Sequence, residues 1–158
     1  MVRLADLPEW ERKHMLEKIP ALPKLGLSPW VGGGPLSKRR VAIVTSAGVH
    51  VRGDRPFGPG AAANDYRVIP GDVAAADVVM SQLSVNFDRT GFQQDLNVVF
   101  PIDRLHELAR EGIIGSVADH HYAFMGAGSP ITRMEAKARE VGKLLKQDKV
   151  DAVLLTPV

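Results

Sequence analysis

The chain has 158 residues, a length that suits one compact domain with a short extension. Hydrophobic residues make up 45% of it, which is enough for a core and too many for a disordered protein. The absence of cysteine excludes disulfides, thiolate metal sites and a cysteine nucleophile from these residues. The net charge is only +2, and no basic stripe with interleaved aromatic residues occurs, so we expect no nucleic-acid partner. No apolar run is long enough for a membrane span and the charged N-terminus has no signal core, so we expect a cytoplasmic protein.

Residues 1–40 predict a helical arm followed by a Pro/Gly linker. A helix is expected over residues 6–19, because Asp6 can cap it and apolar side chains lie near one face, namely Leu7, Trp10, Leu16 and Ile19. The prolines and glycines of residues 20–35 predict the linker. We expect this arm to pack on the domain or on a partner subunit, since Trp10 and Trp30 favour packing over disorder.

Residues 41–158 predict an α/β domain. Apolar runs predict strands at 41–45, 49–51, 66–69, 77–85 and 97–100, then from 113, and finally within 151–158, with a long surface loop over 52–65. One helix is expected from Pro101 to about Arg110, ended by Gly112, and another to about Gln147 after a capping box formed by residues 132–135. Strands that alternate with helices favour an open, mainly parallel sheet with flanking helices.

The last eight residues predict a buried parallel strand that runs into a turn. Val153, Leu154 and Leu155 form an apolar run directly after a helix, which is typical of an interior strand. Ligands of open α/β sheets bind just beyond the carboxyl ends of such strands. We therefore expect the chemistry at the residue that would follow Val158, and the alternative is that Val158 is a natural terminus on an edge strand.

Polar residues gather in three groups at predicted strand ends and loops. The first contains Thr45, Ser46, Gly48, His50 and Asp54, the second Asn86, Asp88, Asp95 and Asn97, and the third His120, His121 and the loop 126–129. A glycine-containing loop before a helix presents backbone N–H groups that can hold a carboxylate. No metal site is predicted, because the adjacent side chains of His120 and His121 diverge in a strand.

Each group also has a purely structural interpretation. His50 either exchanges protons near neutral pH at a functional site or only hydrogen-bonds its own loop. Asp88 and Asn97 are also typical of turns and caps. No complete catalytic set, dinucleotide fingerprint or Walker sequence is present.

Six stretches together resemble a known family. They are residues 41–50 (VAIVTSAGVH), 67–72 (RVIPGD), 95–105 (DLNVVFPIDRL), 114–115 (IG), 124–126 (FMG) and 151–158 (DAVLLTPV). In unbroken order they resemble the selenoprotein B subunits of the glycine, sarcosine, betaine and D-proline reductases, and residues 97–105 are the most specific part. One departure is Asn86-Phe87-Asp88, where the family has a segment like His-Phe-Asp.

The resemblance implies an oxidoreductase subunit that reductively cleaves a C–N bond of a small amino acid or amine. It implies selenocysteine, or cysteine, directly after Val158, so the chain is expected to be truncated at a UGA codon and inactive by itself, as the N-terminal half of a larger doubly wound protein. A partner subunit with a pyruvoyl group, a dithiol electron donor and a hetero- or homo-oligomer are implied as well.

The residues expected to support this chemistry are His50 and Asp88, with Ser46, Asn97, Gly126 and Gly128 in substrate binding. The alternative function is a non-catalytic α/β subunit that binds a small acid or assists assembly.

Overall fold

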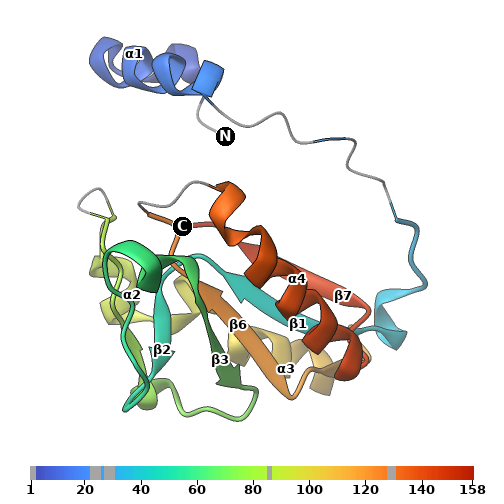
Figure 1. The fold of residues 1–158 in the computed structure, drawn as a ribbon. Coiled ribbons are helices and arrows are strands. Elements are labelled where there is room, and N and C mark those ends of the chain that lie inside the picture. Colours follow the sequence, from blue (N-terminus) through green and yellow to red (C-terminus); the bar gives the residue numbers. More distant parts are fainter. Residues whose placement is uncertain (1–2, 22–25, 27–30, 85–86, 128–130) are drawn as a thin grey trace. The chain divides into compact units, whose positions relative to one another are not determined.

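A five-stranded sheet lies at the centre of residues 33–158 (Figure 1). The structure is a computed structural model that describes residues 3–21, 26, 31–84, 87–127 and 131–158. The chain divides into two units, residues 1–32 and 33–158, which are described separately.

The first unit is helical. It contains the short 3-10 helix η1 (Leu4–Asp6), the α-helix α1 (Glu9–Lys18) and the 3-10 turn η2 (Ile19–Ala21), so the predicted helix exists but is shorter than expected. The predicted cap at Asp6 is wrong, because Pro8 stands at the N-cap and the Asp6 carboxylate accepts a hydrogen bond from the backbone N–H of Arg3. None of the α1 side chains is buried, and Trp10 is 73% exposed. Trp30 lies outside the described residues.

The central sheet is built around β1 (Arg40–Thr45). β7 (Ala152–Thr156) runs parallel to β1 along residues 41–45. The other side of β1 is shared by β5 (Ser116–Val117) and β6 (His120–Phe124), both parallel to it. β3 (Tyr66–Pro70) pairs antiparallel with β6, and β2 (Val49–Val51) and β4 (Val78–Met80) form a separate antiparallel pair. The predicted mainly parallel α/β sheet is therefore confirmed.

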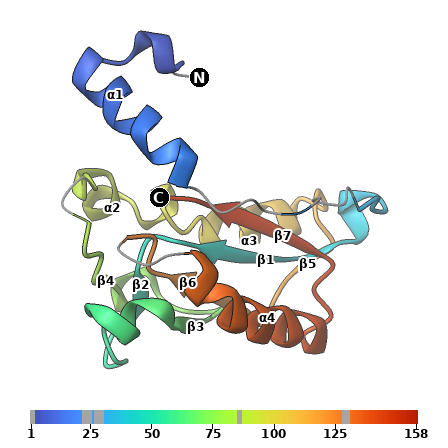
Figure 2. The ribbon, with the colours of Figure 1, turned by 45° about the horizontal axis from the view of Figure 1, so that its top comes forward.

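Two helices cover opposite faces of the sheet, as Figures 1 and 2 show from two directions. On one face, α3 (Ile102–Arg110) packs Ile102 and Leu105 into the main core with Ile43 and Phe100. On the other face, α4 (Ile131–Gln147) packs Val141 against Tyr122 and Phe124. Alternate residues of β1 and β6 thus enter different layers, as the two-residue period of a strand requires.

The remaining elements connect these layers. They are the short helix α2 (Thr90–Gln94) and the 3-10 helices η3 (Leu36–Lys38), η4 (Gly60–Asn64), η5 (Ala75–Asp77) and η6 (Leu96–Val98). Within the described residues, no helix is both long enough and apolar enough to cross a membrane.

Two strand predictions between residues 95 and 117 are wrong for local reasons. Residues 97 and 98 belong to the 3-10 helix η6 and Val99 follows in a turn, because the Asp95 carboxylate accepts hydrogen bonds from the backbone and side-chain N–H groups of Asn97. The strand expected from residue 113 begins at Ser116, because Gly112 takes a left-handed conformation (φ 71°) and the N–H of Ile113 returns to the carbonyl of Leu108.

Two further expectations need correction. α4 begins at Ile131, so Thr132 lies inside its first turn and not at the predicted cap. β7 is not buried, since it lies at an edge of the sheet where Val153 is 40%, Leu154 39% and Leu155 69% exposed.

Candidate functional site

The carboxyl ends of β1, β6 and β7 meet at one end of the sheet, where the side chain and the backbone of Ser46 link them. Its Oγ accepts a hydrogen bond from the N–H of Val158 (2.9 Å) and donates to the carbonyl of Val158 (3.3 Å). The N–H of Ser46 donates to the carbonyl of Thr156 (3.1 Å). One residue after β1 therefore holds the backbone from Thr156 to Val158 in position.

Gly126 completes this contact from the end of β6. Its N–H donates to the carbonyl of Ser46 (2.9 Å). A Cβ at position 126 would lie 3.0 Å from the carbonyl oxygens of both Ser46 and Val158, which is closer than side chains normally approach. A second donor to the Ser46 carbonyl is the side-chain amide of the buried Gln82 (3.2 Å). The absence of a side chain at Gly126 is therefore what lets three segments approach each other.

Two threonine hydroxyls bind the carboxyl ends of β1 and β7 to the segment 97–100. Thr45, which is 1% exposed, donates to the carbonyl of Val99 (2.9 Å), and Thr156 donates to the same carbonyl (3.2 Å). The Thr45 hydroxyl also accepts from the N–H of Ala47 (3.1 Å). The segment 97–100, although not a strand, thus supplies the anchor for the carboxyl ends of β1 and β7.

An apolar groove of about 280 Å³ opens beside this contact, on the face of the sheet that α4 covers. Its walls are formed by Val44, Thr45, Ser46, Phe124, Met134, Ala138, Leu155, Thr156 and Pro157. Hydroxyl groups are the only side-chain polar groups among these residues, so the groove suits hydrocarbon better than charge.

The other predicted site residues lie in separate local structures. His50 is buried in β2, with Nδ1 3.0 Å from the carbonyl of Val51. The Asp88 carboxylate accepts hydrogen bonds from the hydroxyl and the N–H of Thr90, and these bonds lower the pKa of Asp88. The Asn97 amide donates to Asp95 and Asp103 and accepts from the N–H of Asp103, which ties the turn at η6 to the start of α3.

The structure thus brings together two of the predicted residues, Ser46 and Gly126, at Val158. No hydrogen bond within the described part of the chain links His50, Asp88 or Asn97 to that contact. Gly128 lies outside the described residues. Gln82 was not among the predicted residues, and Thr45 was placed in the first polar group without a role of its own. The contacts of Gln82 and Thr45 depend on partners 36 and 54 positions away, respectively, that no local pattern indicates.

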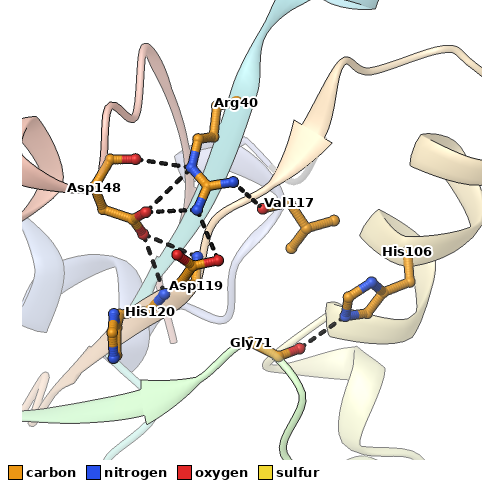
Figure 3. A network of polar contacts seen from close by, with 7 residues as sticks. All are labelled: Arg40, Gly71, His106, Val117, Asp119, His120 and Asp148. Atoms are coloured by element: carbon orange, nitrogen blue, oxygen red, sulfur yellow. Dashed lines mark hydrogen bonds and ion pairs between the residues drawn. The ribbon is translucent and has the colours of Figure 1, made fainter.

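A second polar cluster lies near the amino-terminal end of β1 (Figure 3). The Arg40 guanidinium donates to the carboxylates of Asp148 (2.5 Å) and Asp119 (2.8 Å) and to the carbonyl of Val117. The other Asp148 oxygen accepts from the N–H groups of Asp119 and His120. Burial by itself raises the pKa of Asp148, but the hydrogen bonds from Arg40 and these backbone groups outweigh it and hold the pKa below its usual value. The cluster therefore binds the end of α4 to β1 and to the start of β6.

The adjacent histidines of β6 diverge as expected. His120 is exposed, whereas His121 is completely buried. Nδ1 of His121 accepts the N–H of Ile43 (2.9 Å), its ring meets Phe100 edge-on, and its Nε2 has no hydrogen-bond partner among the described residues. Burial lowers the pKa of His121 from 6.5 to about 4, so the ring is neutral at pH 7.

Residues 18–158 match the family model described as glycine/sarcosine/betaine reductase selenoprotein B (GRDB). The chain belongs to this family. The resemblance on which the sequence expectations rest is thereby confirmed, and it extends into the arm as far as residue 18.

Curated relatives agree with the family match. The chain is 39% identical over 122 residues to the D-proline reductase subunit gamma of Acetoanaerobium sticklandii, which is 77% of this chain and 49% of that protein. It is 36% identical over 123 residues to the glycine reductase complex component B subunit gamma of Symbiobacterium thermophilum, covering 77% and 29%. It is 35% identical over 124 residues to the sarcosine reductase complex component B subunit beta of Peptoclostridium acidaminophilum, covering 77% and 28%.

The matched region therefore spans half or less of the length of these selenoprotein B relatives. No solved structure matches the chain.

Proposed function

We propose that this chain is the N-terminal part of a reductase subunit in which selenocysteine, or cysteine in its place, directly follows Val158. The full-length protein would reductively cleave a carbon–nitrogen bond of a small amino acid or amine. Two findings support the proposal, namely membership of the selenoprotein B family and the fact that more than half of each of these relatives lies outside the matched region. Relatives named for D-proline, glycine and sarcosine reductases suggest the substrate class.

The observation that carries the proposal is the contact of Ser46 and Gly126 with Val158. It fixes the backbone at the carboxyl edge of a mainly parallel sheet, where α/β proteins bind their ligands. A nucleophile on the next residue would start from a defined position, which proximity-based catalysis requires. A selenol is more acidic than a thiol, so it is ionised and nucleophilic at neutral pH.

Within this proposal His50 acts on protons near the selenium. A carbonyl oxygen only accepts hydrogen bonds, so the contact with Val51 places a proton on Nδ1 of the neutral ring and leaves the lone pair on Nε2. We assign the role of base or acid to Nε2. Asp88 and Asn97 would position the substrate or shape the surrounding loops. In the loop that begins at Gly126, the Gly126 N–H already donates to the carbonyl of Ser46, so the proposed contact with the substrate carboxylate falls to the rest of the loop, including Gly128.

The resemblance also implies two partners. A pyruvoyl group on another subunit would hold the substrate amine, and no residue of this chain is assigned to that group. A dithiol donor would supply the electron pair that restores the selenol. The relatives are named as subunits or complex components, which supports a multi-subunit assembly for this chain.

The first test is the nucleotide sequence beyond the codon for Val158. A UGA codon followed by an open frame with further α/β sequence supports the proposal. A UAA or UAG codon with no continuing frame refutes it and favours a non-catalytic binding or assembly subunit.

The role of His50 is tested in the full-length protein. His50→Ala is expected to lower turnover strongly and the free energy of unfolding only slightly. His120 is an exposed histidine of β6, so the control variant His120→Ala should leave both quantities unchanged. Equal losses of turnover and stability in His50→Ala would reduce His50 to a structural residue.

A further inference from the structure

β7 carries apolar side chains that no described element covers. Leu155 is 69%, Val153 40% and Leu154 39% exposed, and β1 is the only described strand that pairs with β7. An uncharged apolar edge strand invites pairing with another chain, and proteins normally cover such edges. Parallel sheets in particular are covered by helices on both faces.

The crossover that leads into β7 indicates which face of β7 the next helix covers. It runs from β6 through α4 to β7, passes β1 on the way, and carries its helix on the face opposite α3, as Figures 1 and 2 show. Crossovers between parallel strands are right-handed, so the direction of movement decides the face. A segment that leaves β7 and forms a new parallel strand on its outer side therefore places the connecting helix on the α4 face.

The exposed side chains fit this direction. Leu155 pairs in register with Val44, which packs in the cluster under α4, and Val153 pairs with Ala42 on the same face. Leu155, the most exposed residue of β7, also forms one wall of the apolar groove beside α4. A helix beside α4 would cover both side chains and would insert its own into the groove, as neighbouring helices pack 8–10 Å apart.

We infer that β7 and the groove beside α4 form the docking surface for the segment that follows Val158 in the full-length protein. That segment contributes a helix against Val153 and Leu155 and then a strand parallel to β7. This inference rests on the proposed function, in which the chain continues beyond Val158. The selenoprotein B relatives supply the required length, since at least half of each lies outside the matched region.

Hydrogen exchange of the β7 amides tests the inference. The full-length protein, with cysteine in place of selenocysteine, is compared with the chain that ends at Val158. We expect the amides of Val153 and Leu155, which alternate with those that face β1, to exchange about tenfold or more slowly in the full-length protein, because a strand on the outer side of β7 would then accept their hydrogen bonds.

A pair of lysine variants gives an independent readout. Val153→Lys should lower the melting temperature of the full-length protein by several degrees and leave the shorter chain nearly unchanged. Val68→Lys is the matched control, because Val68 is the same residue type, 38% exposed, on the α4 face of the opposite edge strand β3. It should shift both proteins equally.

The outcomes separate the two proposals. A reading frame that stops after Val158 overturns both. A frame that continues while the β7 amides exchange equally in both proteins overturns the docking surface alone. If the exchange is equally slow in both proteins, a second copy or the N-terminal arm already covers β7 in the shorter chain.

Discussion

The buried histidine His121 makes the stability of the protein depend on pH in a predictable direction. Its Nδ1 accepts the N–H of Ile43, so protonation of the ring breaks that bond and leaves a charge inside the core. The pKa of His121 is about 4 in the folded chain, against 6.5 for a free histidine. The unfolded chain therefore takes up the proton first as the pH falls, and the free energy of unfolding decreases from about pH 6.5 downward.

The size of the effect follows from the two pKa values. Each tenfold difference in proton affinity corresponds to about 1.4 kcal/mol, so the loss approaches about 3 kcal/mol at pH 4 and is absent above pH 7. Because both tryptophans lie in residues 1–32, urea unfolding is best followed by far-UV circular dichroism, at intervals from pH 7.5 to pH 4.5. The imidazole resonances of His121 report its pKa directly by NMR.

His121→Gln isolates the contribution of this ring. The Gln side-chain oxygen can accept the Ile43 N–H and does not titrate in this range, so the variant starts less stable at pH 7 and approaches the wild type as the pH falls. His120→Gln, at the exposed neighbouring position, should keep the wild-type pH profile. Parallel pH profiles for the wild type and His121→Gln, or an NMR pKa near 6.5, would refute the reasoning.

Three further substitutions test the contacts at the two ends of the sheet by urea unfolding at pH 7. Asp148→Asn should lower the free energy of unfolding by about 2–3 kcal/mol, because Arg40 loses its better-buried charged partner. The loss should exceed that of Asp119→Asn, since the Asp119 side chain is 76% exposed, and equal losses would contradict this reasoning. Gly126→Ala should destabilise the protein by about 1–3 kcal/mol, because its Cβ would come too close to Ser46 and Val158. Gly142→Ala in α4 is the control and should stabilise slightly, since a Cβ there meets nothing within 4 Å. A neutral Gly126→Ala would mean that the end of β7 is loosely held. Thr45→Val should lower the free energy of unfolding by about 1–3 kcal/mol and by more than Thr156→Val does. The reason is that the Thr45 hydroxyl makes hydrogen bonds with both Val99 and Ala47, whereas the Thr156 hydroxyl bonds Val99, and the reverse order would be inconsistent with these contacts.

The strands and helices that the sequence predicts correctly are those with strong local signals. The apolar run of β1 and the proline and glycine that bound α3 are contained within a few residues, so their interpretation needs no distant partner. The run 97–100 misled the prediction because its residues favour a strand, while the side chains of Asp95 and Asn97 close a turn that competes with one. Local signals therefore fail where side-chain hydrogen bonds replace backbone pairing.

The candidate site was predicted only in part, for a related reason. Ser46 and Gly126 could be identified because they follow strands, and parallel strands present their carboxyl ends at one edge. Whether Ser46 and Gly126 bind substrate, and whether His50, Asp88 and Asn97 contribute, stays a prediction. Gln82 was missed, because its contact with Ser46 spans 36 positions and leaves no periodic signal.

The sequence by itself determined the α/β class, the main elements and the resemblance to the selenoprotein B family, because these depend on runs and motifs of neighbouring residues. Only the tertiary structure decided that β7 lies at an edge with Leu155 exposed, since a buried and an edge strand can have the same apolar run. It also decided the contacts of Ser46 with Val158 and of Arg40 with Asp148, whose partners lie 112 and 108 positions apart. Such contacts form only when the sheet brings the ends of distant strands together, and no local propensity encodes them.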